Sequence, residues 1–206
     1  ADVYDNTISL SPSVAQVGKT VFSTCSPVRL RVSDSEGNRT GFLSDDSEAE
    51  DIEGSSADEI GHNHFVAVPE GGTYYVQVEG TDQGSFTPEP TDFDSAGNIL
   101  RRLTWLEVPV VTGSQDTMTT AFGADNPILS VDTNGDGVPD FQLPPDGDGD
   151  RVPDFADTCS DTPLGGIVNA SGCSINQLVS CAGPTAGGRW KNHGAYVSAV
   201  AKKAEE

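Results

Sequence analysis

Positive charge is scarce in this sequence, since its 206 residues contain only 11 Lys and Arg against 32 Asp and Glu, a net charge of −21. So acidic a chain is a poor partner for nucleic acid or for an anionic membrane surface. Long apolar runs are also missing. No stretch approaches the roughly 18 apolar residues that a membrane-spanning helix needs, so we expect no membrane insertion.

Catalytic motifs are equally absent. The sequence has no Gly-x-Ser-x-Gly nucleophile elbow, no His-Glu-x-x-His metal motif and no glycine-rich phosphate loop. Carboxylate pairs can hydrolyse glycosides, but among so many acidic residues the presence of a pair is no evidence for this activity. We therefore expect a protein that is not an enzyme.

The four cysteines, Cys25, Cys159, Cys173 and Cys181, form no Cys-x-x-Cys pair, which argues against zinc binding and thioredoxin-like redox chemistry. Cys159 and Cys173 bracket a short glycine-rich loop, which predicts a local disulfide and an oxidising compartment. Cys25 follows a strand-like run and is expected to be a buried thiol. Cys181 has no obvious partner, unless it pairs with Cys25 or with residues beyond Glu206.

The start of the chain, Ala-Asp-Val, has no initiator Met and no basic, apolar leader. This fits a mature chain after signal cleavage, and we expect a secreted or cell-surface protein.

Residues 1–125 predict an antiparallel β-sandwich. Apolar and polar residues alternate near Ile8, in residues 28–32, 66–68 and 74–78, and less regularly in residues 105–111. The abundance of Gly (23) and Pro (13) favours many short strands separated by turns. An acidic stretch from Asp45 to Glu59 is predicted to be a solvated loop, with a further cation site as the alternative.

Two aspartate-rich loops follow, and each places an oxygen ligand at every second residue. Their glycines allow the positive φ of a tightly wound chain, and their mid-loop valines offer a backbone carbonyl. Calcium takes six to eight such oxygens at roughly 2.3–2.6 Å, so we predict Ca²⁺ as the ligand. The predicted ligands are Asp132, Asn134, Asp136, Val138 and Asp140 in the first loop, and Asp146, Asp148, Asp150, Val152, Asp154 and Asp157 in the second.

The closing position differs between the two loops. Asp157 supplies a twelfth-position carboxylate in the second loop, whereas Leu143 stands there in the first. We therefore predict that the first site is the weaker one and needs Asp140, water or an Asp from the second loop. Such segments are often plain linkers, or acidic surfaces adapted to salty surroundings, but two tandem loops with matching Val-Pro-Asp endings favour calcium.

The Asp spacing and the tail Asp157-Thr-Cys-Ser-Asp-Thr-Pro to Cys173 resemble thrombospondin type 3 repeats of the bacterial kind, over roughly residues 132–175. The resemblance implies calcium-binding loops with little regular secondary structure that act as stiff spacers. Leu143, and Ser160 in place of the usual Pro, depart from the family pattern. Residues 20–90, with Gly72-Thr-Tyr-Tyr-Val-Gln-Val-Glu-Gly80, are similar to the non-catalytic pre-peptidase C-terminal sandwich of bacterial exoproteins.

We thus expect three parts: a sandwich (1–125), calcium repeats with a Cys-bounded loop (126–180), and a linker with a short helix capped by Asn192 (181–206). The leading hypothesis is an extracellular structural protein, a surface-layer or filament subunit that self-associates and whose connector Ca²⁺ rigidifies. Residues 3–10 would then add a strand to a neighbouring subunit. The alternatives are an accessory module of a secreted peptidase or glycosidase, and carbohydrate binding by the sandwich. His62 and His64 are minor metal candidates, and Trp105 is expected in the core.

Overall fold

The computed structural model describes residues 17–45, 47–124, 126–163, 166–184 and 187–204. The N-terminal strand expected near Ile8, and the strand donor expected at residues 3–10, lie outside these ranges. The described part of the chain is mainly β with a short C-terminal helix, as predicted from the sequence, and a further single-turn helix precedes it. None of the helices in the described part is long and apolar enough to cross a membrane.

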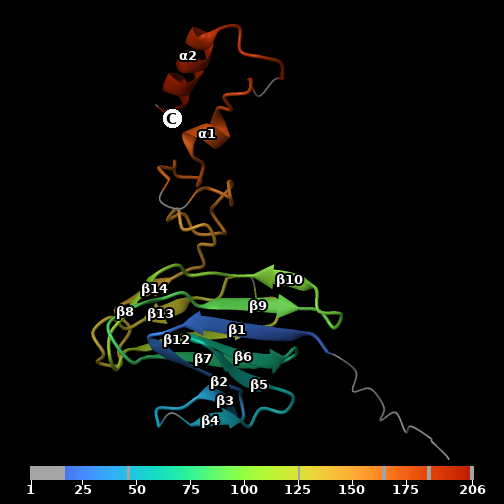
Figure 1. Cartoon of the computed structure of the whole chain (residues 1–206), viewed down its shortest axis with the longest axis vertical. Coiled ribbons are helices and arrows are strands. Elements are labelled where there is room, and N and C mark those ends of the chain that lie inside the picture. The colour runs from blue at the N-terminus through green and yellow to red at the C-terminus, as the bar shows by residue number, and fades with distance from the viewer. Residues whose placement is uncertain (1–16, 46, 125, 164–165, 185–186, 205–206) are drawn as a thin grey trace, which may run out of the picture.

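Two antiparallel sheets form the sandwich (Figure 1). The smaller sheet has five strands, in the order β10 (Ile99–Arg102), β9 (Glu89–Phe93), β1 (Lys19–Cys25), β6 (Asn63–Pro69) and β5 (Ser56–Ile60). The larger sheet has seven, in the order β14 (Phe141–Leu143), β13 (Leu129–Val131), β12 (Gln115–Ala121), β7 (Thr73–Gly80), β2 (Val28–Ser33), β3 (Arg39–Phe42) and β4 (Glu48–Glu50). A separate ribbon pairs β8 (Gly84–Phe86) with β11 (Val108–Val110).

Alternation along the strands builds the core. In β2, Val28, Leu30 and Val32 are at most 2 % exposed while the arginines between them face outward. Strand β7 alternates in the same way, and its Val76 and Val78 pair in register with Val32 and Leu30. The two apolar faces meet between the sheets and remove these side chains from water.

Three local expectations change in the structure. The acidic stretch 45–59 is not simply a loop, because it contains β4 and β5, which are the edge strands of the two sheets. The strand expected over residues 105–111 is confined to Val108–Val110, since Trp105 pairs only through an isolated bridge to Asp146. The expected division after residue 125 stays a prediction, but the seven-stranded sheet continues past it into β13 and β14.

The C-terminal part projects from one end of the sandwich (Figure 1). It contains the predicted Cys159–Cys173 disulfide, the single-turn helix α1 (Ile175–Leu178) and helix α2 (His193–Lys203). The Asn192 carboxamide oxygen accepts the Ala195 N–H at 2.9 Å, which confirms the predicted cap. Cys25, expected to be buried, is only half-buried, and the exposed Cys181 is not joined to it.

Candidate metal centre

The first aspartate-rich loop, residues 132–140 (loop 1), is the turn of the β13–β14 hairpin at the edge of the larger sheet. Its two ends are held together by the Asp140 N–H, which donates to the Val131 carbonyl at 2.7 Å. The second loop, residues 146–157 (loop 2), starts just after β14. Its Asp146 N–H donates to the Thr104 carbonyl at 3.0 Å, which ties loop 2 to the sandwich.

Both loops are wound by the same hydrogen bonds. The first Asp of loop 1, Asp132, accepts the N–H groups three and five residues on, at 2.8 and 2.9 Å. The first Asp of loop 2, Asp146, accepts the N–H groups at the same offsets, both at 2.9 Å. In both loops the ninth residue, Asp140 or Asp154, accepts the N–H of the second. The two loops therefore share the same backbone winding.

The carboxylates of loop 2 converge. One oxygen from each of Asp146, Asp148 and Asp150 lies within 4.8 Å of the other two. Asp150 is only 4 % exposed, and its Oδ2 is buried without any hydrogen-bond partner in the described structure. A buried carboxylate oxygen without a donor is costly unless a cation neutralises it. The donor set therefore fits a hard divalent cation held by oxygen ligands.

Gly172 brings the predicted closing residue to the same place. A Cβ built on Gly172 would lie 1.9 Å from Asp157 Oδ1 and 3.1 Å from Asp150 Oδ2, so both carboxylates approach this glycine. Gly172 precedes Cys173, and the disulfide from Cys173 to Cys159 fixes it against the stretch that follows Asp157. The disulfide loop thus holds the closing carboxylate beside the cluster.

The electrostatics of loop 2 also favour a cation. Burial raises the pKa of Asp146, and the neighbouring charges of Asp148 and Asp150 raise it further, while two peptide N–H groups lower it. A bound cation would reverse the first two effects, because it stabilises each ionised carboxylate. The remaining predicted ligands of loop 2 are the mid-loop carbonyl of Val152 and the carboxylate of Asp154, which already accepts the Gly147 N–H at 2.7 Å.

Loop 1 does not form such a cluster among the described residues. Asp132 is fully buried and accepts two further peptide N–H groups, from Asn134 at 3.2 Å and Gln115 at 3.2 Å. Asp140 accepts both the N–H and the hydroxyl of Thr133. Asn134, Asp136 and Val138 lie on the open side, and Val138 is 63 % exposed. Asp132 and Asp140 are thus hydrogen-bonded within the protein, whereas the exposed Asp136 accepts the Val138 N–H at 2.8 Å.

Asp116 in β12 supports loop 1 and was not singled out from the sequence. Its Oδ1 accepts the Asp132 N–H at 2.7 Å, and its side chain is fully buried, with Oδ2 unpartnered. Burial raises the pKa of Asp116 to about 7, the Asp132 N–H lowers it and the charge of Asp132 raises it. The signal in the sequence is slight: Asp116, Met118 and Thr120 alternate on the inward face of a strand.

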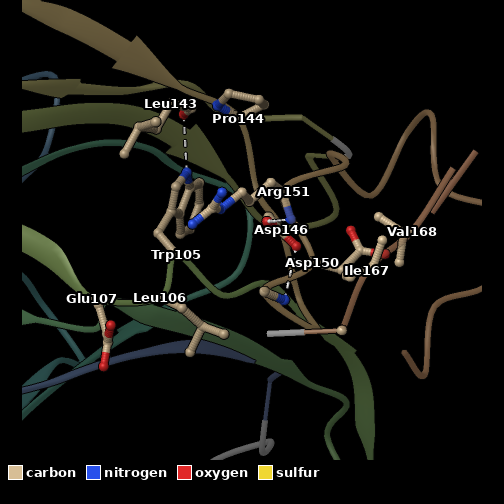
Figure 2. Close-up of a pocket in the computed structure, with 12 residues that line it drawn as sticks. Trp105, Leu106, Glu107, Leu143, Pro144, Asp146, Asp150, Arg151, Ile167 and Val168 are labelled. Atoms are coloured by element: carbon tan, nitrogen blue, oxygen red, sulfur yellow. Dashed lines mark hydrogen bonds between the residues drawn. The ribbon is translucent and has the colours of Figure 1, made fainter. Parts of the chain in front are cut away.

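A cleft of about 760 Å³ lies where loop 2 meets the sandwich (Figure 2). Asp146 and Asp150 line it between Trp105 on the sandwich side and Ile167 with Val168 on the other. Trp105 is 2 % exposed, as expected for a core residue, and its indole N–H donates to the Leu143 carbonyl at 3.0 Å. Its ring is therefore not available as a platform for a sugar.

The minor metal candidates are not brought together. His64 is buried and stacks on Phe42 with ring centroids 4.1 Å apart, whereas His62 is exposed in the β5–β6 turn. In the described part of the chain, neither histidine belongs to a group of three potential metal ligands. The acidic stretch around β4 contains no such group among its described residues.

Comparison of the chain with protein-family models, with curated proteins and with solved structures found no match. The resemblance to thrombospondin type 3 repeats therefore stands on the motifs of residues 132–175 alone.

Proposed function

We propose that this chain is a non-catalytic, calcium-binding structural protein of the extracellular space or the cell surface. Loop 2 is the principal Ca²⁺ site, and the ion rigidifies the connector between the sandwich and the C-terminal helices. The observation that carries the proposal is the convergence of Asp146, Asp148 and Asp150 within 4.8 Å, with Asp150 Oδ2 buried and unpartnered.

Calcium is the ion that this site suits best. Its ligands are carboxylate and carbonyl oxygens, which hard cations prefer, and the group contains no His or Cys. Mg²⁺ keeps most of its waters and demands strict octahedral geometry, whereas Ca²⁺ accepts six to eight oxygens from a wound loop. Loop 2 offers carboxylates from Asp146, Asp148, Asp150, Asp154 and Asp157 and the carbonyl of Val152.

The structural role follows from where the site lies. The segment after β14 has few buried apolar side chains: within residues 144–184 the described core contains only Cys173 and Val179. Hydrophobic burial contributes little to its order, so a bound ion would supply most of the missing free energy. The disulfide fits an oxidising, extracellular setting.

Calorimetric titration with CaCl₂, together with thermal melts in millimolar Ca²⁺ and in excess EGTA, tests the proposal. We expect at least one site and a melting temperature several degrees higher in Ca²⁺, because a ligand at about 100 times its Kd stabilises by about 2.7 kcal/mol. Asp148→Asn should abolish most of the heat, and Asp82→Asn, an exposed carboxylate of the sandwich, should leave it unchanged. Equal melts in Ca²⁺ and EGTA, with no heat of binding, would refute the proposal.

A further inference from the structure

The charges of the chain are separated along its sequence. The 45 residues from Thr162 to Glu206 hold four of the 11 Lys and Arg residues but only two acidic residues, Glu205 and Glu206. Residues 40–100 show the reverse, with no Lys or Arg and 14 Asp and Glu. The C-terminal segment is thus basic in a protein whose net charge is −21.

The fold turns this separation into two opposite ends. Helix α2 lies at one end of the elongated molecule, and β4 and β5 lie at the other end (Figure 1). We call the first the basic end, with Arg189, Lys191, Lys202 and Lys203. We call the second the acidic end; its exposed carboxylates are those of Glu48, Glu50, Asp51, Glu53, Asp58 and Glu59.

The basic end is only partly covered by the rest of the chain, through contacts of α2 with α1 and of Tyr196 with Trp190. None of the 11 residues of α2 is buried, and Val197 is 48 % exposed. Isolated helices shorter than about 12–15 residues are marginal in water, so α2 needs a packing partner. Beside it lies a groove of about 330 Å³, whose apolar wall includes Leu178, Val179 and Trp190 and whose rim includes Lys202.

The acidic end carries a feature that matches this groove. Ile60, the last residue of β5, is 67 % exposed at the tip of the β5–β6 hairpin. Asp58 and Glu59 precede it and are exposed as well. An apolar side chain beside carboxylates complements an apolar groove rimmed by a lysine.

We propose that the basic end of one copy docks on the acidic end of a second copy, with Ile60 in the groove beside α2 and the carboxylates of β4 and β5 facing the lysines. The partner is a second copy because the two complementary surfaces occur on one chain. They lie at opposite ends, so the contact is heterologous and propagates into linear assemblies instead of closing as a dimer. This inference deepens the proposed structural function by naming the contact between subunits.

Sedimentation velocity in calcium, at low and at high NaCl, tests the contact. The wild-type protein should form concentration-dependent linear oligomers at low salt that dissociate at high salt, because salt screens exposed charges. The basic end is reversed by Arg189→Glu/Lys191→Glu/Lys202→Glu. The acidic end is reversed by Glu48→Lys/Asp51→Lys/Glu53→Lys/Asp58→Lys. Each reversal should weaken association by about tenfold or more. Ile60→Ser should weaken association at low salt, because it removes the apolar contact and leaves the charges in place.

Mixing the two charge-reversed proteins gives the decisive result. Each should be monomeric alone, but the mixture should associate, because the acidic α2 end of one matches the basic β4–β5 end of the other. Lys19→Glu, on β1, is the control matched to Lys202→Glu and should leave association unchanged. A monomeric wild-type protein, or a mixture that fails to associate, would overturn the proposal.

Calcium calorimetry on the same variants separates this proposal from the proposed function. The substituted residues lie outside both aspartate loops, so each variant should bind Ca²⁺ as the wild-type protein does. Normal Ca²⁺ binding by a protein that never associates would overturn the contact alone. Absence of Ca²⁺ binding in the wild-type protein would overturn the proposed function, whatever its state of association.

Discussion

The two aspartate loops have the same backbone hydrogen bonds but different surroundings. Loop 1 closes a hairpin of the sandwich, and its Asp132 is saturated by peptide N–H groups. Loop 2 leaves the sandwich and gathers three carboxylates, and among the described residues no donor reaches Asp150 Oδ2. The comparison teaches that repeated Asp and Gly residues wind the loop, whereas the surroundings of the loop decide whether its carboxylates converge.

The fifth residue of each loop offers the sharpest test of this difference. Asp150→Asn should weaken Ca²⁺ binding by about a hundredfold, because it removes a buried charge from the cluster, and affinity in such loops follows the number of charged ligands. Asp136→Asn, at the same position of loop 1, should change the affinity by no more than a few-fold, since Asp136 is exposed. Titration calorimetry measures both.

Asp161→Asn, an exposed residue of the disulfide loop, is the control for a general loss of negative charge. Equal losses from Asp150→Asn and Asp136→Asn would contradict the assignment of loop 2 as the principal site.

The buried Asp116, which supports loop 1, should make the stability of the protein depend on pH. Burial raises the pKa of Asp116 to about 7, from 3.8 in the unfolded chain. The folded protein therefore binds the proton more tightly, and its free energy of unfolding should fall as pH rises from about 4 to 7. Asp116→Asn keeps the acceptor for the Asp132 N–H and removes the charge. In EGTA at pH 8 it should stabilise the protein by about 2 kcal/mol, less than the pKa shift alone implies because the new amide also needs a partner.

Urea denaturation at pH 4 and pH 8 measures this effect, and the exposed Asp82→Asn serves as its control. A variant that is no more stable than the wild-type protein at pH 8 would show that the Asp116 charge is already compensated.

Closure of loop 2 can be broken without removing any ligand. Gly172→Ala would place a methyl group 1.9 Å from Asp157 Oδ1 and force that carboxylate away from Asp150. We expect Ca²⁺ affinity to fall by about tenfold, as measured by calorimetry. Gly137→Ala in loop 1 is the matched control: both glycines have positive φ, 75° and 79°, but a Cβ on Gly137 meets no atom within 4 Å. Equal losses of Ca²⁺ affinity in the two variants would mean that backbone strain, and not the displacement of Asp157, lowers the affinity.

The sandwich could be predicted from the sequence where apolar alternation is regular. Residues 28–32 and 74–78 became β2 and β7 at the centre of the larger sheet. The acidic strands β4 and β5 could not be found in this way, because edge strands carry charged residues where central strands carry apolar ones. Strand β14 could not be predicted for another reason. It has only three residues, between two Pro- and Asp-rich stretches, and so short a segment shows no apolar alternation.

The metal centre was predictable in its ligands but not in its closure. Spacing alone located Asp146, Asp148 and Asp150, since the loop geometry is local. The approach of Gly172 to Asp150 and Asp157 depends on a fold-back through the disulfide loop. The fully buried Asp116 meets Asp132 only because β12 is the neighbour of β13. Contacts between segments that are distant in the sequence cannot be inferred from the spacing of residues within one segment.

The smallest expected effect concerns the sixth residue of each loop, where the winding requires a left-handed backbone. Gly137 takes this position in loop 1 with φ 79°, but Arg151 takes it in loop 2 with φ 77°. A residue with a Cβ is strained there by about 1–2 kcal/mol, which glycine avoids at the expense of greater freedom in the unfolded chain. Arg151→Gly should therefore raise the free energy of unfolding by about 0.5 kcal/mol in urea denaturation.

Exchange between the loops completes this test. Gly137→Arg should lower the free energy of unfolding, because it adds the same strain to loop 1. The exchange of both residues only moves the strain from loop 2 to loop 1, so it should leave stability nearly unchanged. Ca²⁺ affinity should rise about twofold in Arg151→Gly, because the change removes a positive charge from the cleft that Asp146 and Asp150 line, while the N–H of residue 151 still donates to Asp146. A less stable Arg151→Gly protein would mean that the arginine side chain, which lines the cleft beside Trp105, contributes more than its backbone costs.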